Sequence, residues 1–325
     1  MAKIVISHRL HDDGMAVLEK AGVDVVITNS GEPADMLPEL KDADGVIIRI
    51  GRIDKATMEQ CPKLKVIARP GVGVDDVDVA GATELGIPVV IAPGANTRSV
   101  AEHSMAMMFA CAKDMLHSDQ EMRKGNFGVR SSYKAYELFG KTLGLIGYGH
   151  IGGDFAEMAT GIGMKVLVYD PFISKEAVEK QGYGYRETVE DILKEADVIS
   201  IHTPLTPETK NMIGEKEIAL MKSDAILINC ARGGIVDEAA LDKALSENRI
   251  HSAGTDVVVH EPIDPNDPLF THDNIIVTPH MAGQTREAAS GVATMAAEGA
   301  VAVVNGMKWD KVCNPKAYDH QRWQK

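Results

Sequence analysis

The chain has 325 residues, 45% of them hydrophobic and 25% charged, which suits two globular domains of ordinary size. Its formal net charge of −13 argues against a nucleic-acid or anionic membrane partner. We also find no apolar run near the roughly 20 residues that a transmembrane helix needs. The four cysteines form no CxxC pair, so we expect reduced thiols and no metal site. The N-terminal sequence MAKIVISHRL lacks the pattern of a signal peptide, and we therefore expect a cytoplasmic location.

The first 100 residues alternate short apolar stretches with helical ones such as His11–Ala21. This alternation is typical of a small α/β unit with a mostly parallel sheet. The predicted strands of this unit are Lys3–Ser7, Asp24–Thr28, Gly45–Arg49, Lys65–Arg69 and Pro88–Ile91.

Two of these strands end in an arginine, Arg49 and Arg69, and Arg69 leads into a loop that contains Gly71, Val72 and Gly73. Ligands of open parallel sheets bind beyond the carboxyl ends of the strands, and backbone amides of a glycine-rich loop can bind an anion. These residues are therefore candidates for binding a substrate carboxylate or phosphate. The alternative is an arginine on the surface beside a structural turn.

Residues 97 to about 122 predict one long helix, in which Ser99 and Glu102 have the spacing of a capping box. Its middle is rich in alanine and methionine on more than one face, which predicts burial between domains or subunits. The polar segment Gly125–Phe139 that follows is a candidate arm onto a second subunit.

A glycine-rich sequence, Gly147–Gly152, lies between the apolar run that starts at Leu143 and a helical pattern, and the next strand ends at Asp170. In such a turn Gly147 permits the tight bend, Gly149 lets the backbone approach a pyrophosphate, and Gly152 lets helix and strand pack closely. The helix N-terminus attracts phosphates. A carboxylate at position 170 suits the ribose of NAD and repels the 2′-phosphate of NADP, so we predict NAD(H).

Further strands are predicted from residue 166 to residue 278, separated by helices that include Glu187–Glu195 and Glu238–Glu247. This order predicts a doubly wound dinucleotide-binding unit, and an alanine-rich helix over 284–306 leads back to the first unit. Polar residues follow the strand ends, which should bring them to one edge of the sheet. They are Gly147, Asp170, His202, Thr203, Cys230, Ala231, Arg232, Asp256 and His280, with Glu261 on the loop after Asp256.

Three of these residues suit the reduction of a keto acid by hydride transfer. His280 can deliver a proton near neutral pH, and the carboxylate of Glu261 can orient the imidazole and stabilise its cation. Arg232 can bind the substrate carboxylate through its two-pronged guanidinium. Each also has a structural alternative: a capping or core histidine, a solvated loop carboxylate, and an arginine paired with a neighbouring aspartate.

The chain resembles the D-isomer-specific 2-hydroxyacid dehydrogenase family over nearly all its length, and within it the phosphoglycerate dehydrogenase-like members. The motifs that carry the resemblance are Arg69–Asp75, Asn96–Glu102, Gly147–Gly152, Tyr169–Pro171, His202–Pro207, Asn229–Asp237, Asp256–Pro262, Asp267–Phe270 and Thr278–His280. The resemblance implies a Rossmann NAD domain over 101–289, inserted into a flavodoxin-like substrate domain made of 1–100 and 290–325. It also implies a homodimer, with the substrate entering a cleft between the domains.

The resemblance further implies a role for each matching residue. Arg232 would bind the substrate, and His280 paired with Glu261 would be the acid and base. Arg49 and Arg69 would approach a substrate phosphate. Contacts to NAD would come from His150, Ile151, Asp170, Thr203, Cys230, Ala231, Arg232, Asp256, His280 and the loop through Gly283.

The sequence departs from the family pattern at a few positions. Asp154 follows Gly153 where family members often have arginine, which should weaken the anion site slightly. Asp76 stands where asparagine is usual, and Pro70 stiffens the loop after Arg69, which can alter selectivity. We expect no amino-acid-binding regulatory domain after residue 315 and no serine feedback through one.

We therefore predict an NAD-dependent oxidoreductase that interconverts a 2-keto acid and a D-2-hydroxy acid, such as 3-phosphoglycerate or glycerate. The alternative from another class is a non-catalytic NAD(H)-sensing protein of the corepressor kind, because such relatives can retain Arg232, Glu261 and His280. A phosphite- or formate-type dehydrogenase is a second rival, and Glu261 argues against the formate type, in which glutamine is expected.

Overall fold

The computed structural model describes residues 1–324 and divides into two compact units. The terminal unit comprises Met1–Asn96 with Gln284–Lys325, and the central unit comprises Thr97–Gly283. The chain therefore crosses between the units at 96/97 and 283/284, against the predicted crossings at 100/101 and 289/290.

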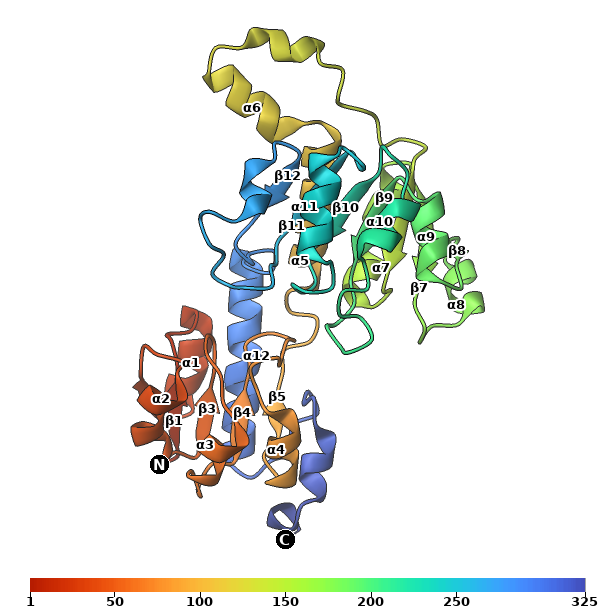
Figure 1. Cartoon of the computed structure of the whole chain (residues 1–325). Helices are drawn as coiled ribbons and strands as arrows, with labels where there is room; N and C mark the ends of the chain where they lie inside the picture. Colours follow the sequence, from red (N-terminus) through yellow and green to blue (C-terminus); the bar gives the residue numbers. More distant parts are fainter. Residues whose placement is uncertain (325) are drawn as a thin grey trace. The chain divides into compact units, whose positions relative to one another are not determined.

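The terminal unit is built on a five-stranded parallel sheet within the described residues (Figure 1). Its order is β2-β1-β3-β4-β5, which is the flavodoxin-like order. The predicted flavodoxin-like fold is thus confirmed, with strands shorter than expected. The strands are β1 Lys3–Ile6, β2 Asp24–Ile27, β3 Gly45–Ile47, β4 Val66–Ala68 and β5 Val89–Val90.

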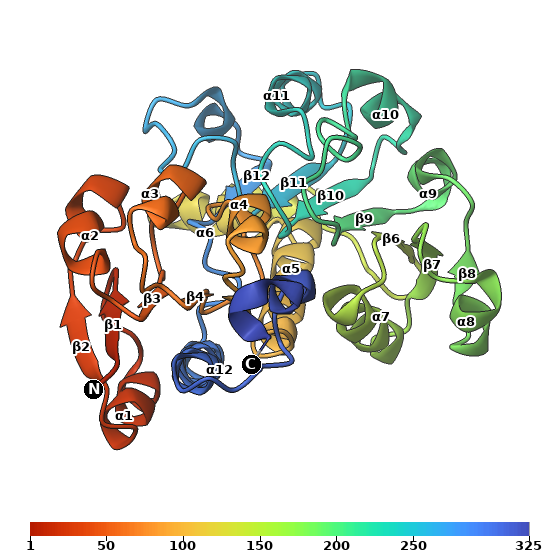
Figure 2. The same cartoon turned by 90° about the horizontal axis from the view of Figure 1, so that it is seen from below.

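Both faces of this sheet are buried, which explains why its strands are continuous apolar runs. Ile4 and Ile6 pack with α1 and α12 on one face, whereas Val5 between them packs with α2, α3 and α4 on the other (Figure 2). The helices are α1 Asp12–Lys20, α2 Pro33–Leu40, α3 Lys55–Glu59, α4 Val79–Glu84 and α12 Arg286–Val304.

The C-terminal part of the chain belongs to the terminal unit. The 19-residue helix α12 is long and apolar enough to cross a membrane by length and composition, but it packs against α1, β3 and β4 as a core helix. Beyond it, Val312 forms an antiparallel bridge with Val90 of β5, and the Asn314 side chain accepts the Val89 amide at 2.7 Å. The short 3₁₀ helices η3 Pro315–Asp319 and η4 Gln321–Trp323 follow.

The central unit is built on a seven-stranded parallel sheet, again counted over the described residues, with the order β12-β11-β10-β9-β6-β7-β8. From the other edge, its first six strands in chain order run 3-2-1-4-5-6, the Rossmann order. The predicted dinucleotide-binding fold is confirmed: the two-residue strand β8, which was not predicted, is the third strand of this order, and β12 is a seventh strand at the edge. The strands are β6 Thr142–Ile146, β7 Lys165–Tyr169, β8 Gly184–Tyr185, β9 Val198–Ile201, β10 Ile226–Asn229, β11 Ser252–Thr255 and β12 Ile275–Val277.

Helices cover both faces of the central sheet (Figure 2). One face packs against α5 and α7 around Phe155, and the other against α9, α10 and α11 around Ile192, Ile218 and Leu241. The helices are α5 Thr97–Ala112, α7 His150–Gly161, α8 Lys175–Lys180, α9 Val189–Glu195, α10 Glu215–Leu220 and α11 Glu238–Ser246.

The prediction of one helix over 97–122 is wrong, because α5 ends at Ala112 and α6 starts at Met115. Between them Asp114 has a left-handed backbone, φ +50°, which breaks the helical hydrogen bonding. The predicted capping box is also absent from the described helix: Ser99 lies inside α5, and Glu102 pairs with Arg98 at 2.8 Å. Helix α6 runs from Met115 to Arg123 and continues into η1 Phe127–Ser131.

Candidate active site

The candidate residues of the central unit follow the carboxyl ends of its parallel strands. Gly147 follows β6, Asp170 follows β7, and His202 follows β9. Arg232, Asp256 and His280 come after β10, β11 and β12, which are neighbours in the sheet. Adjacent strands lie about 4.8 Å apart, so the ends of β10 and β12 are about 10 Å apart. The order of the strands reverses between β6 and β9, where ligands of open α/β sheets bind.

Two of the three fingerprint glycines, Gly147 and Gly152, are required by the local backbone, and the third, Gly149, leaves open space. Gly147 has φ +97°, and a Cβ there would lie 2.6 Å from the His202 carbonyl oxygen. A Cβ on Gly152 would lie 2.5 Å from the Gly147 carbonyl oxygen, so the helix approaches the turn closely. A Cβ on Gly149, the N-cap of α7, would meet no protein atom within 4 Å. The backbone at the start of α7, which includes His150 and Ile151, can thus be approached by a pyrophosphate.

Asp170 is 9% exposed and is fixed by the backbone around it. One carboxylate oxygen accepts the Tyr148 amide at 2.8 Å, and the other accepts the Phe172 amide at 2.8 Å. The first of these bonds ties the end of β7 to the glycine-rich turn after β6. A carboxylate oxygen can accept more than one hydrogen bond, so Asp170 can still receive ribose hydroxyls.

His202 and Thr203 stand at the switch point between β6 and β9. The His202 imidazole packs edge-on against Phe155 and lies 2.9 Å from the Ser200 hydroxyl. Burial lowers the pKa of His202 to about 4, so it is neutral at pH 7 and belongs to the packing of the turn. The Thr203 hydroxyl oxygen is buried with no hydrogen-bond partner in the protein, as expected of a group that a ligand satisfies.

Arg232 lies on the loop after β10, and the side chain of Asn229, the last residue of β10, fixes the conformation of this loop. The Asn229 side chain donates to the Arg232 carbonyl at 3.0 Å and accepts the Ala231 amide at 3.1 Å. The Arg232 guanidinium donates to the Ala231 carbonyl at 2.7 Å. The Cys230 thiol lies 3.7 Å from the Met107 sulfur, and burial raises its pKa to about 12. Any contact of Cys230 with a cofactor would therefore be made by its backbone.

Asp256 organises the segment that carries His280. The Asp256 carboxylate is 1% exposed and accepts the Thr278 hydroxyl at 2.5 Å, the Met281 amide at 2.9 Å and the Ala282 amide at 2.8 Å. Its backbone carbonyl accepts the His280 amide at 2.8 Å. His280 itself has a left-handed backbone with φ +50°, which costs of order 1–3 kcal/mol and persists only where the surroundings impose it. A cofactor contact of Asp256 stays a prediction, as does one of Gly283, the last residue of the central unit.

His280 and Glu261 meet directly. The His280 Nδ1 atom lies 2.8 Å from the Glu261 carboxylate, although the two residues are 19 positions apart in the chain. About half of the imidazole is exposed, and its Nε2 atom faces away from this bond. The pair can therefore exchange a proton with a small molecule at the strand ends.

In the terminal unit, the two arginines differ in what they contact. Arg69 is largely buried and donates to the Ile48 carbonyl at 2.7 Å and to the Gly73 carbonyl at 3.3 Å, and it lies 3.5 Å from Asp76. This arginine thus shapes the 71–73 loop. The Arg49 side chain is exposed and donates to the Arg9 carbonyl at 3.1 Å. Val72, at the tip of the loop, is 48% exposed.

Sequence reasoning missed two contributors. Thr278 lies within a recognised motif, and its hydroxyl donates to Asp256. Glu238 lies at the start of a predicted helix, and its carboxylate accepts the Val259 amide. The sequence feature that could have pointed to Glu238 is its position directly after the loop that carries Arg232. Among residues 1–324 we find no cluster of three or more histidine, cysteine or acidic residues that could hold a metal. The four cysteines carry unpaired thiols.

Comparison with known proteins gives consistent matches. Residues 105–282 match the family model for the NAD-binding domain of D-isomer-specific 2-hydroxyacid dehydrogenases. The D-3-phosphoglycerate dehydrogenase of Methanocaldococcus jannaschii is 42% identical over 97% of this chain and 60% of its own length. The glyoxylate reductase of Aeropyrum pernix is 37% identical over 94% of this chain and 93% of its own.

The fold matches solved structures as well. The D-lactate dehydrogenase of Aquifex aeolicus, solved with NAD and lactic acid, has a TM-score of 0.84 at 31% identity, covering 93% of this chain and 96% of that one. The chain spans about 60% of the length of the phosphoglycerate dehydrogenases that it matches. From the matched domain and the near-complete coverage of this chain by its relatives, we conclude that the chain belongs to the D-isomer-specific 2-hydroxyacid dehydrogenase family.

Proposed function

We propose that this protein is an NAD(H)-dependent dehydrogenase that interconverts a 2-keto acid and a D-2-hydroxy acid. The observation that carries the proposal is the 2.8 Å contact between His280 and Glu261, two strand positions from Arg232 on one sheet edge. NAD(H), when bound, accepts or supplies the hydride. The fingerprint glycines, Asp170 and the unpartnered Thr203 hydroxyl fit this cofactor.

Each side chain of the site has a role in this reaction. Arg232 binds the substrate carboxylate through two guanidinium N–H groups. His280 donates a proton from Nε2 to the carbonyl oxygen as it becomes an alcohol, and it takes that proton back in the oxidation. Glu261 holds Nδ1 and stabilises the imidazolium. Asp256 and Thr278 keep His280 in place by bonding the segment on both sides of it.

Replacing Asp170 by asparagine is expected to lower the preference for NADH over NADPH about 10- to 100-fold. The reason is that a carboxylate held beside the ribose repels a 2′-phosphate, and like charges in contact cost several kcal/mol. The ratio of kcat/KM for the two cofactors measures the effect. Asp154→Asn is the control, because its carboxylate is on α7 and should affect both cofactors alike. An unchanged ratio in Asp170→Asn would show that the cofactor is not selected here.

The substrate within the class is tested by a panel of 2-keto acids with NADH, ranked by kcat/KM. We propose that Arg49, together with the loop that Arg69 shapes at Val72 and Gly73, binds a second anionic group of the substrate. This predicts that 3-phosphohydroxypyruvate is preferred to hydroxypyruvate, and that Arg49→Gln removes the preference. Equal rates for the two substrates would refute the phosphate role, whereas no turnover of any keto acid would refute the dehydrogenase.

We also propose a homodimer formed through the central unit. Apolar side chains are exposed along α6 and the segment after it: Met115, Leu116, Met122, Phe127 and Tyr133 are 44–89% exposed. Burial in a subunit contact would remove this apolar surface from water. Sedimentation equilibrium should give twice the 35.0 kDa chain mass, and a monomer at micromolar concentration would contradict the proposal.

The unpaired cysteines support a reducing compartment, and we propose the cytoplasm. Imaging of the tagged protein in its own cells would test this location, and a secreted protein would refute it.

A further inference from the structure

The segment Val257–Glu261 connects the parts of the candidate site. Glu261 at its end contacts His280, and the Val258 amide donates to Glu261 at 3.4 Å. Its other side packs on the Arg232 loop: a Cβ built on Gly233 would lie 2.0 Å from the Val258 carbonyl oxygen. No side chain fits between the two backbones, so the position of this segment depends on the loop that carries Arg232.

The Glu238 side chain forms a hydrogen bond to the same segment. Its carboxylate accepts the Val259 amide at 2.7 Å. Glu238 is the first residue of α11, which Asp237 caps by accepting the Ala239 and Ala240 amides at 3.0 and 3.1 Å. The preceding residues are fixed too, because Gly234 and Ile235 carbonyls accept the Asn211 and Ile213 amides. Glu238 therefore reaches Val259 from a firmly held base.

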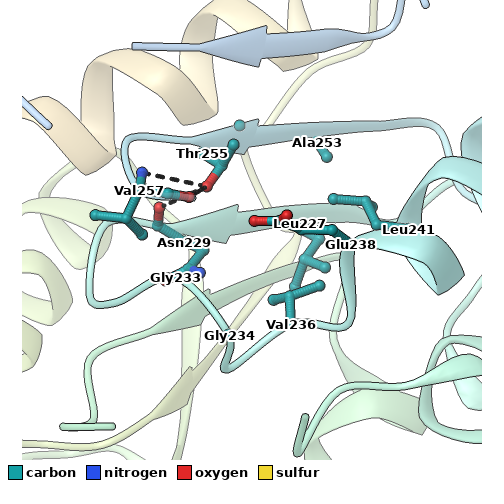
Figure 3. Close-up of a pocket in the computed structure, with 11 residues that line it drawn as sticks. Leu227, Asn229, Gly233, Gly234, Val236, Glu238, Leu241, Ala253, Thr255 and Val257 are labelled. Carbon is teal, nitrogen blue, oxygen red and sulfur yellow. Dashed lines mark hydrogen bonds between the residues drawn. The ribbon is translucent and has the colours of Figure 1, made fainter. Parts of the chain in front are cut away.

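The Glu238 carboxylate is partly enclosed by its neighbours. With Asn229, Gly233, Thr255 and Val257 it lines a cavity of about 10 Å³ behind the Arg232 loop (Figure 3). Burial raises the pKa of Glu238, with a further contribution from Asp267, while the Val259 amide and His260 act in the opposite direction. Enclosing a carboxylate even partly costs free energy unless it is hydrogen-bonded, and the Val259 amide supplies such a bond.

Beyond these contacts, the start of the segment is held by Thr255, whose hydroxyl donates to the carbonyl of the buried Val257 at 2.6 Å. Between β11 and η2 Pro268–Thr271 the chain forms no helix or strand within the described residues. Val259 and Glu261 are both substantially exposed. The bond from Glu238 thus holds the exposed part of this stretch, at Val259.

We infer that Glu238 is a positioning residue for the reaction: by holding the Val259 amide it places Glu261 against His280 and keeps that pair in register with Arg232. The inference rests on the proposed function. Loss of the bond would let the segment shift, and a displacement of about 1 Å in an active site can cost up to about 100-fold in rate.

The test is a double-mutant cycle between Glu238→Ala and Glu261→Gln, with Glu238→Gln as the conservative variant. Glu238→Ala should reduce kcat/KM for the best keto acid about tenfold, whereas Glu238→Gln, which keeps an acceptor oxygen, should stay within about twofold of the wild type. In a Glu261→Gln background, Glu238→Ala should cost less than about twofold, because its effect acts through Glu261. Glu247→Ala, an exposed carboxylate at the end of the same helix, is the control.

Amide hydrogen exchange at Val259 provides a readout that needs no substrate. Protection should be lost in Glu238→Ala and kept in Glu238→Gln, with the unfolding midpoint measured alongside. Unaltered protection in Glu238→Ala, full activity of that variant, or an equal loss in the Glu261→Gln background would overturn the inference. If the wild type turns over no keto acid, the proposed function fails, while the exchange result still decides whether Glu238 holds this segment.

Discussion

Replacing His280 by glutamine is expected to reduce kcat for 2-keto acid reduction about 10²- to 10⁴-fold, the usual contribution of a positioned acid or base. Glutamine can still hydrogen-bond Glu261 but has no proton to give near neutral pH. Binding of NADH should change little, because the glycine-rich turn and Asp170 lie at other strand ends. Stopped-flow measurement of NADH consumption, with cofactor affinity from fluorescence titration, separates the two quantities.

Glu261→Gln tests the same pair from the other side. It keeps the size of the side chain but removes the negative charge beside the imidazole, so the protonated form of His280 is less stabilised. We expect a smaller loss of kcat than for His280→Gln, and no further loss when the two changes are combined.

A second histidine–carboxylate pair provides the matched control. His272 lies 2.7 Å from Asp242, on the same unit and before β12. His272→Gln should leave kcat unchanged even if it lowers the unfolding midpoint. If His280→Gln kept full turnover, or if His272→Gln lost as much, then the His280–Glu261 contact would be a structural one.

Replacing Arg232 by lysine is expected to reduce kcat/KM for the keto acid about 10²- to 10³-fold, mostly through KM. Lysine keeps the charge, but it cannot donate the two parallel N–H groups that match a carboxylate. Hydrogen bonds to charged groups contribute about 1.5–3 kcal/mol each, and each 1.4 kcal/mol is tenfold. Steady-state kinetics over a range of keto acid concentrations give the two parameters.

Arg249 is the control for this change, because its guanidinium also donates to backbone carbonyls of the central unit, those of Ala219 and Met221. Arg249→Lys should alter stability rather than KM. An unchanged KM in Arg232→Lys would show that Arg232 serves the loop, through its bond to the Ala231 carbonyl, and not the substrate.

The two sheets could be predicted because both faces of each are covered, which makes the strands continuous apolar runs such as Val166–Val168. The order of strand ends likewise brings Arg232, Asp256 and His280 to one edge. The helix break at Asp114 could not be predicted, because the residues around it have ordinary helical propensities and no glycine or proline marks the left-handed backbone.

The candidate site could also be predicted only in part from the sequence. Motif spacing could indicate that Arg69 and Asp256 matter, but not that Arg69 donates to the Ile48 and Gly73 carbonyls, or that the Asp256 carboxylate is occupied by Thr278, Met281 and Ala282. Apart from the Arg69–Gly73 bond, these bonds join residues 21 to 26 positions apart, and no local pattern encodes them. The left-handed residue His280 lies between Thr278 and Met281, which both bond Asp256.

The most direct test of the dehydrogenase assignment is isotope transfer from NADH that carries deuterium at the transferable position of the nicotinamide. The wild-type protein should place the label on C2 of the 2-hydroxy acid product, and chiral analysis should find the D configuration. A product without deuterium at C2, or no consumption of NADH with any 2-keto acid, would contradict the account.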